Sequence, residues 1–161
     1  MKRNKNNGLT MVEVMVTIAV MAVLASIGGI TVGVLLSQRV KSMGADTKSV
    51  IQSTQMVARS RDDAYVEIKQ VGDNVVVTAY SSAGKKINSV EGHNMTASVV
   101  YGNNSSDAVS ASGVVIKFDR QTGGIKPNSG SEDDYVKQIV ITNGRRTVTL
   151  KISKLTGKVT Y

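Results

Sequence analysis

The sequence predicts an α+β protein in which a long N-terminal helix packs on an antiparallel β-sheet head. Residues 14–36 form an uncharged and mostly apolar run, and residues 40–58 keep an apolar stripe at helical spacing. Beyond residue 62 the apolar residues alternate in short segments separated by turn-forming residues, which is typical of strands. The helix is therefore expected to have a membrane-spanning half and an amphipathic half.

The composition limits the organisation of the chain and its chemistry. With 161 residues, the chain has room for one anchor and one compact domain. It contains no cysteine, which excludes disulfides, thiolate chemistry and cysteine-based zinc sites. The net charge of +8 is compatible with anionic partners but does not identify one.

The N-terminal segment combines a basic leader, a single carboxylate and an apolar run. Residues 1–8 are polar and cationic, and residues 14–36 carry no charge. A run of about 23 residues is long enough to span a bilayer as a helix. Glu13 directly precedes this run, and inserting a carboxylate into a membrane costs on the order of 2.5–3.5 kcal/mol. A chain that retains such a residue is expected to use it.

Two general interpretations explain only part of this segment. A secretory signal peptide cleaved after Ala25 accounts for the small residues there, but the apolar run continues well beyond that position. A plain single-pass anchor accounts for the length and for the basic leader, but it gives Glu13 no role.

The run Gly8-Leu9-Thr10-Met11-Val12-Glu13 resembles the class III signal of type IV pilins and pseudopilins, in which Gly is followed by Phe-Thr-Leu-x-Glu. The chain departs from this pattern at Leu9, where Phe is usual. The resemblance implies that a prepilin peptidase cleaves between Gly8 and Leu9 on the cytoplasmic side and that Leu9 is N-methylated. It also implies that Glu13 pairs with the Leu9 amine of a neighbouring subunit and thereby sets the register of assembly.

The anchor contains a small-xxx-small pattern at Gly29 and Gly33, which allows helices to approach closely. The alternative is that Gly is simply common in membrane helices. Many major pilins carry a proline near this depth, whereas the only proline here is Pro127, which favours a minor subunit.

The predicted organisation is a leader at 1–8, a transmembrane and assembly helix at 9–36, an amphipathic continuation at 37–61, and a β-rich extracytoplasmic head at 62–161.

The amphipathic half is predicted from one apolar stripe, and the head from alternating segments. The stripe contains Val40, Met43, Thr47, Val50, Ile51, Thr54, Val57 and Ala58. Strands are expected at 65–71, 75–80, 98–101, 114–118, 136–142, 145–153 and 158–161. Residues 102–112 read as a loop, and Asn143-Gly144 is a strong hairpin signal.

The order of a long helix, a meander and terminal hairpins is similar to that of minor pseudopilins of the GspH/FimT type. The likeness covers only the C-terminal third. It rests on an apolar strand with a Gly-rich turn at 114–124, a strand at 135–142, the basic turn Gly144-Arg145-Arg146, and the ending Thr156-Gly157-Lys158-Val159.

Residues that could support catalysis or metal binding are isolated. His93 is the only histidine and is expected in a surface loop. Asp62-Asp63 and Glu132-Asp133-Asp134 lack the spacing of a calcium loop, so solvated loop charge is the better interpretation. We expect no enzyme activity, no catalytic residues, no metal and no cofactor.

One concentration of basic residues occurs near the C-terminus and comprises Arg145, Arg146, Lys151, Lys154 and Lys158. Such residues could contact the phosphates of DNA. They also discourage strand aggregation at sheet edges, and this is the favoured interpretation because no aromatic residues interleave to stack on bases.

The sequence therefore predicts a filament subunit, a minor pilin or pseudopilin of a type IV pilus-like or type II secretion-like system. Its expected partners are the prepilin peptidase, other pilin subunits, the inner assembly platform and membrane lipid. It would first lie in the cytoplasmic membrane as a single-pass protein with its head outside, and then in a surface or periplasmic filament. The alternatives are a DNA-binding minor pilin for DNA uptake and a membrane-anchored scaffold that never polymerises.

Overall fold

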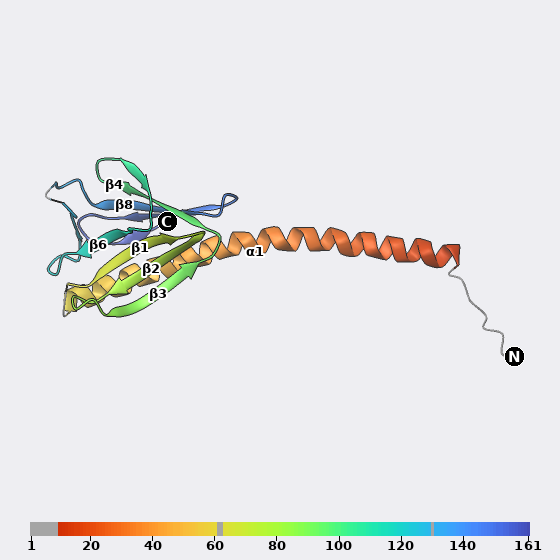
Figure 1. The fold of residues 1–161 in the computed structure, drawn as a ribbon, viewed down its shortest axis with the longest axis horizontal. Helices are drawn as coiled ribbons and strands as arrows, with labels where there is room; N and C mark the ends of the chain where they lie inside the picture. The colour runs from red at the N-terminus through yellow and green to blue at the C-terminus, as the bar shows by residue number, and fades with distance from the viewer. Residues whose placement is uncertain (1–9, 61–62, 130) are drawn as a thin grey trace. The chain divides into compact units, whose positions relative to one another are not determined.

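The computed structural model describes residues 10–60, 63–129 and 131–161, with the side chains of residues 27–36 outside the description. The contacts divide the chain into two units, Met1–Leu36 and Ser37–Tyr161. Helix α1 (Met11–Ser60) belongs to both units, and ten strands follow it in the second (Figure 1). The predicted α+β class with a β-rich head is confirmed.

The head contains two five-stranded antiparallel sheets. The first has the strand order β3-β2-β1-β6-β7 and the second β10-β9-β8-β4-β5. The strands are β1 (Tyr65–Val71), β2 (Asn74–Tyr80), β3 (Lys86–Gly92), β4 (Thr96–Tyr101), β5 (Ser106–Ala108), β6 (Val114–Phe118), β7 (Ile125–Lys126), β8 (Val136–Thr142), β9 (Thr147–Ile152) and β10 (Val159–Thr160).

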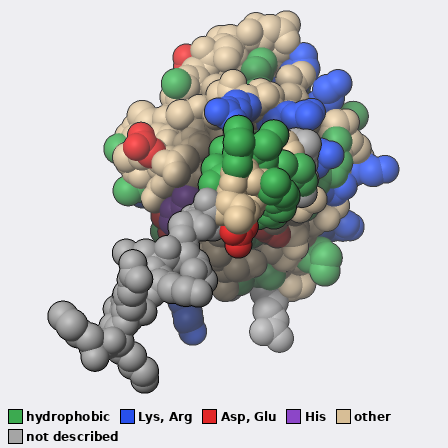
Figure 2. All heavy atoms as spheres, turned by 90° about the vertical axis from the view of Figure 1, so that its right-hand side faces the viewer, with side chains coloured by type: hydrophobic (Ala, Val, Ile, Leu, Met, Phe, Trp, Pro, Cys, Tyr) green, Lys and Arg blue, Asp and Glu red, His purple; other side chains and the backbone are tan. Residues whose placement is uncertain are grey.

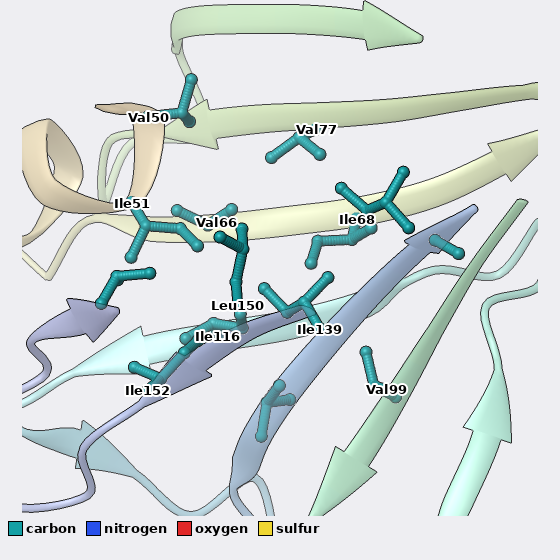
Figure 3. Close-up of a cluster of buried hydrophobic side chains, with 14 of the residues drawn as sticks. Val50, Ile51, Val66, Ile68, Val77, Val99, Ile116, Ile139, Leu150 and Ile152 are labelled. Atoms are coloured by element: carbon teal, nitrogen blue, oxygen red, sulfur yellow. The ribbon is translucent and has the colours of Figure 1, made fainter. Parts of the chain in front are cut away.

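Both sheets contribute to one apolar core, to which the second half of α1 also belongs. Figure 3 shows side chains of the first sheet, such as Val66 and Ile68, and of the second, such as Ile139 and Leu150, meeting in this core with Ile51 of the helix. The alternating strand residues supply it because successive side chains point to opposite faces of a sheet. The predicted helical stripe is confirmed, since all of its members are buried except Val57, which is half-buried.

Gly44 lies on the buried side of α1 and allows a close approach to the second sheet. A Cβ atom at this position would lie 2.7 Å from Cγ1 of Val148 on β9. The helix continues through Gly44 without interruption. The residue therefore serves packing between helix and strand.

Several short or polar strands were not predicted. β5 falls in the segment 102–112 that was expected to be a loop, and β3 and β7 fall in segments for which no element was predicted. The loop between β8 and β9 is also longer than the Asn-Gly signal indicated. Thr142 pairs with Thr147, so residues 143–146 form the turn, and Arg145 and Arg146 belong to it rather than to the following strand. Asn143 Oδ1 accepts hydrogen bonds from the amides of Arg145 (3.1 Å) and Arg146 (2.9 Å).

Two loops of the head, at residues 119–125 and 153–157, are held together by α1. Nε2 of Gln55 donates hydrogen bonds to the carbonyl oxygens of Gly123 and Thr156, both at 2.6 Å. The amide of Ile125 donates to the Lys154 carbonyl at 2.8 Å. Hydrogen bonds from the amide and hydroxyl of Thr122 lower the pKa of Asp119 at the start of the first loop. We call this region, residues 119–125 and 153–157, the distal loops.

A buried hydroxyl on α1 gives a direct stability prediction. Thr47 is fully buried, and in the described part of the chain its Oγ1 has no hydrogen-bond partner. An unsatisfied buried hydroxyl is unfavourable. We expect Thr47→Val to raise the free energy of unfolding by about 1 kcal/mol in urea titrations of the full chain in detergent.

Thr54 is the matched control for this prediction. It is also buried on α1, but its Oγ1 donates to the Val50 carbonyl at 2.7 Å. Thr54→Val therefore removes a satisfied group and should bring no gain. Equal effects of the two substitutions would show that the Thr47 hydroxyl carries no special penalty.

Candidate functional site

The first turn of α1 is closed by a reciprocal capping box. The Glu13 amide donates to Oγ1 of Thr10 at 3.3 Å, and the Thr10 amide donates to Oε2 of Glu13 at 3.3 Å. The Val14 amide donates to the Thr10 carbonyl at 3.1 Å, which is the first helical bond. Thr-x-x-Glu at a helix start is the sequence signature of this motif. The Glu13 carboxylate is thereby held at the helix N-terminus, where the helix dipole also favours it.

Beyond this cap, residues 14–26 of α1 are mostly apolar on all sides of the helix. Every residue from 10 to 26 is exposed, and Glu13 is the only charged one among them. The large exposed apolar side chains are Met11, Val12, Val14, Met15, Val16, Ile18, Val20, Met21, Val23 and Leu24. A helix that is hydrophobic all round is normally buried in protein or in a membrane.

The polar groups of this segment are satisfied within the helix. The Thr17 hydroxyl donates to the Val14 carbonyl at 2.8 Å, and the Ser26 hydroxyl donates to the Val23 carbonyl at 2.7 Å. Neither hydroxyl therefore needs water as a partner, so the segment can enter apolar surroundings at little cost. Glu13 is the exception, because a carboxylate has more acceptor sites than the capping bonds use.

Parts of the predicted assembly region lie beyond the description. The cleavage and methylation positions Gly8 and Leu9 are outside the described residues, as is the environment of Gly29 and Gly33. Within the part of the chain that is described, no helix has an apolar stretch long enough to cross a membrane.

The predicted basic cluster does not form one surface. Arg145 and Arg146 lie in the β8–β9 turn. Lys151 and Lys158 line a hollow of about 360 Å³ together with Lys137, which the sequence analysis did not select. Lys154 is engaged elsewhere, since its Nζ lies 3.6 Å from Oε2 of Glu132 and 5.2 Å from the ring centre of Tyr135. A continuous cationic strip for a nucleic acid is therefore not assembled from these five residues.

The remaining candidate groups show ordinary surface behaviour. His93 is exposed, with its Nδ1 3.8 Å from Oε1 of Glu91. Asp62 is outside the described residues, and Asp63 makes a 3.7 Å contact with Lys126. Glu132 is exposed and pairs with Lys154 as described above. Among the residues for which the structure gives positions, no group of three potential metal ligands comes together.

Comparison with known proteins gives one match. Residues 3–29 match the model of the prokaryotic N-terminal methylation motif. This match supports the class III signal of type IV pilins and pseudopilins, and with it a pilin-like subunit of a type IV pilus or secretion system. Such a signal implies processing by a peptidase and assembly with other pilins. No curated protein and no solved structure matches the chain, so the likeness of the head to minor pseudopilins stays a prediction.

Proposed function

We propose that this chain is a minor pilin or pseudopilin, cut between Gly8 and Leu9 by a prepilin peptidase and inserted into a filament through the first half of α1. The observation that carries the proposal is the coincidence of the methylation motif at residues 3–29 with the exposed, mostly apolar segment 10–26, in which Glu13 is the only charged residue. In this mechanism the basic leader, residues 1–8, stays in the cytoplasm, and the anchor holds the subunit in the membrane until assembly.

Cleavage after Gly8 supplies the partner that Glu13 lacks. It creates an α-amino cation at Leu9, next to an apolar helix. In a filament core both charges lose water, and the desolvation is offset only if each finds an opposite charge. The capping box holds the Glu13 carboxylate at the N-terminus of α1, where it can accept a hydrogen bond from the Leu9 amine of a neighbouring subunit. This pairing would set how far one helix lies along the next.

Intact-mass and N-terminal analysis of the protein recovered from native membranes tests the processing step. We expect a chain that starts at Leu9 and carries one N-methyl group. Gly8→Leu should leave the leader uncut, whereas Asn7→Leu, the same change one residue earlier, should still be processed. A start at Ser26 would show an ordinary secreted protein, and an uncut Met1 in the native chain would show a plain anchor; either result contradicts the proposal.

A further inference from the structure

The direction of α1 within the head identifies which strands lie where the chain enters it. Gln55 contacts the distal loops, and Gly44, three turns earlier, lies against Val148 on β9. Towards lower residue numbers the helix therefore runs towards the β8–β9 turn. Met95 supports the same placement of the β8–β9 turn. It lines one hollow together with Arg39 of α1 and a second hollow together with Gly144 of the turn. The turn 143–146 thus lies at the entry end of the head, which begins at Ser37.

This entry end carries four cations. Arg39 and Lys41 project from α1, and Arg145 and Arg146 project from the β8–β9 turn; all four are exposed. In the described part of the chain, none of them has a carboxylate within ion-pair distance. In Figure 2 the visible Lys and Arg side chains gather mainly on one side of the molecule, away from most of the acidic ones. We call these four residues the entry cations.

Three acidic residues lie near this end: Asp46 and Glu91 line the hollow that Arg39 borders, and Asp73 lines the hollow beside the 143–146 turn. Asp46 Oδ2 accepts from the Ser42 hydroxyl at 3.3 Å. Glu91 Oε1 accepts from Asn74 Nδ2 at 2.9 Å and lies near His93. Since no described carboxylate forms an ion pair with an entry cation, all four can bind an external anion.

Chain continuity places Arg39 and Lys41 just after the end of the predicted anchor. Arg39 follows Leu36, the last residue of the predicted anchor, by three helical residues, a rise of about 4.5 Å. That distance is shorter than the screening length of about 8 Å at physiological salt. Each Lys or Arg held near an anionic bilayer raises the equilibrium constant for binding to that surface by about fivefold.

We propose that the entry cations dock the head on anionic phospholipid headgroups while the subunit waits in the membrane. The proposal rests on the membrane-held state in the proposed function. A nucleic acid is the less suitable occupant. Among the described residues, Lys151 and Lys158 lie towards the distal loops, and Lys154 there pairs with Glu132.

The absence of cysteine makes a site-specific test possible. A fluorophore is attached at Thr147→Cys, beside the turn, or at Ser131→Cys, beside the Lys154–Glu132 pair. The full chain is reconstituted in vesicles of phosphatidylglycerol and phosphatidylcholine in equal parts, or of phosphatidylcholine alone. Energy transfer to a headgroup-labelled lipid then reports which end of the head lies near the surface.

We expect strong transfer from position 147 only in the anionic vesicles, and its loss at high salt. Arg145→Gln with Arg146→Gln should lower the ratio of docked to undocked heads by about 25-fold, since two cations are removed. The control Lys151→Gln with Lys158→Gln removes the same charge elsewhere and should leave the transfer unchanged.

Other outcomes separate the possible failures. Chains that do not float with either vesicle would overturn the anchor and this proposal together. Chains that float but show equal transfer in both vesicles, or that are insensitive to the arginine substitutions, would overturn the docking alone. If those substitutions instead abolish salt-dependent binding of duplex DNA by chains in neutral vesicles and leave lipid contact intact, the entry cations serve DNA.

Discussion

Glu13→Gln should leave the chain processed and methylated but exclude it from filaments. Glutamine can still accept the capping hydrogen bond from the Thr10 amide, so the helix start is preserved. The substitution removes only the charge. An unpaired amine buried in a filament costs about 3–5 kcal/mol. We therefore expect at least a hundredfold lower ratio of filament-borne to membrane-borne subunit, measured on sheared filaments and on membranes.

Thr10→Ala is the matched control, because it breaks the other half of the capping box and keeps the carboxylate. Loss of the Thr10 Oγ1 acceptor should fray the first turn at a cost of about 1 kcal/mol. Assembly should persist, and intact mass verifies that processing is unchanged. The reverse pattern, with Glu13→Gln in filaments and Thr10→Ala excluded, would show that Glu13 acts as a helix cap and not as a charge partner.

The elements that sequence predicted well are those whose burial imposes a period. The stripe of α1 is readable because one face of the helix is covered by the core, and the apolar residues recur accordingly. β1 and β8 were predicted with their observed bounds because alternate residues enter the core. β3 was missed because it is an edge strand. Its apolar residues Ile87 and Val90 are three positions apart, and Ile87 lies at an irregularity in the pairing with β2, so no alternation reveals the strand.

The basic cluster shows where proximity in sequence misleads. Residues 145–158 are close in the chain, but the six residues of β9 separate the β8–β9 turn from the distal loops by about 20 Å. The capping box, in contrast, has its signature in Thr10-Met11-Val12-Glu13, but it was not predicted from the sequence. These residues also belong to the processing signal. The role of Glu13 as a helix cap therefore became visible only from the hydrogen bonds.

The distal loops contain the position where a small change should have the largest effect on stability. Gly157 has a φ of +62°, and a Cβ atom there would collide with the backbone carbonyl oxygen of Gly123. It would also lie 2.5 Å from Nε2 of Gln55, whose two hydrogen bonds join these loops to α1. Because a backbone atom is the obstacle, a side-chain rotation cannot relieve the contact. Gly157→Ala should therefore separate the loops from the helix.

We expect Gly157→Ala to lower the free energy of unfolding by about 3 kcal/mol, combining left-handed strain with loss of packing. Urea denaturation of the full chain in detergent, followed by the tyrosine signal of the head, measures this. Gly144→Ala is the control, because Gly144 has a φ of +80° with no atom within 4 Å of the added Cβ. It carries the strain of a positive φ without the collision, and should cost about 1 kcal/mol. If the two variants unfold at the same urea concentration, the contact between the distal loops contributes nothing, and Gly157 is there only for its backbone angle.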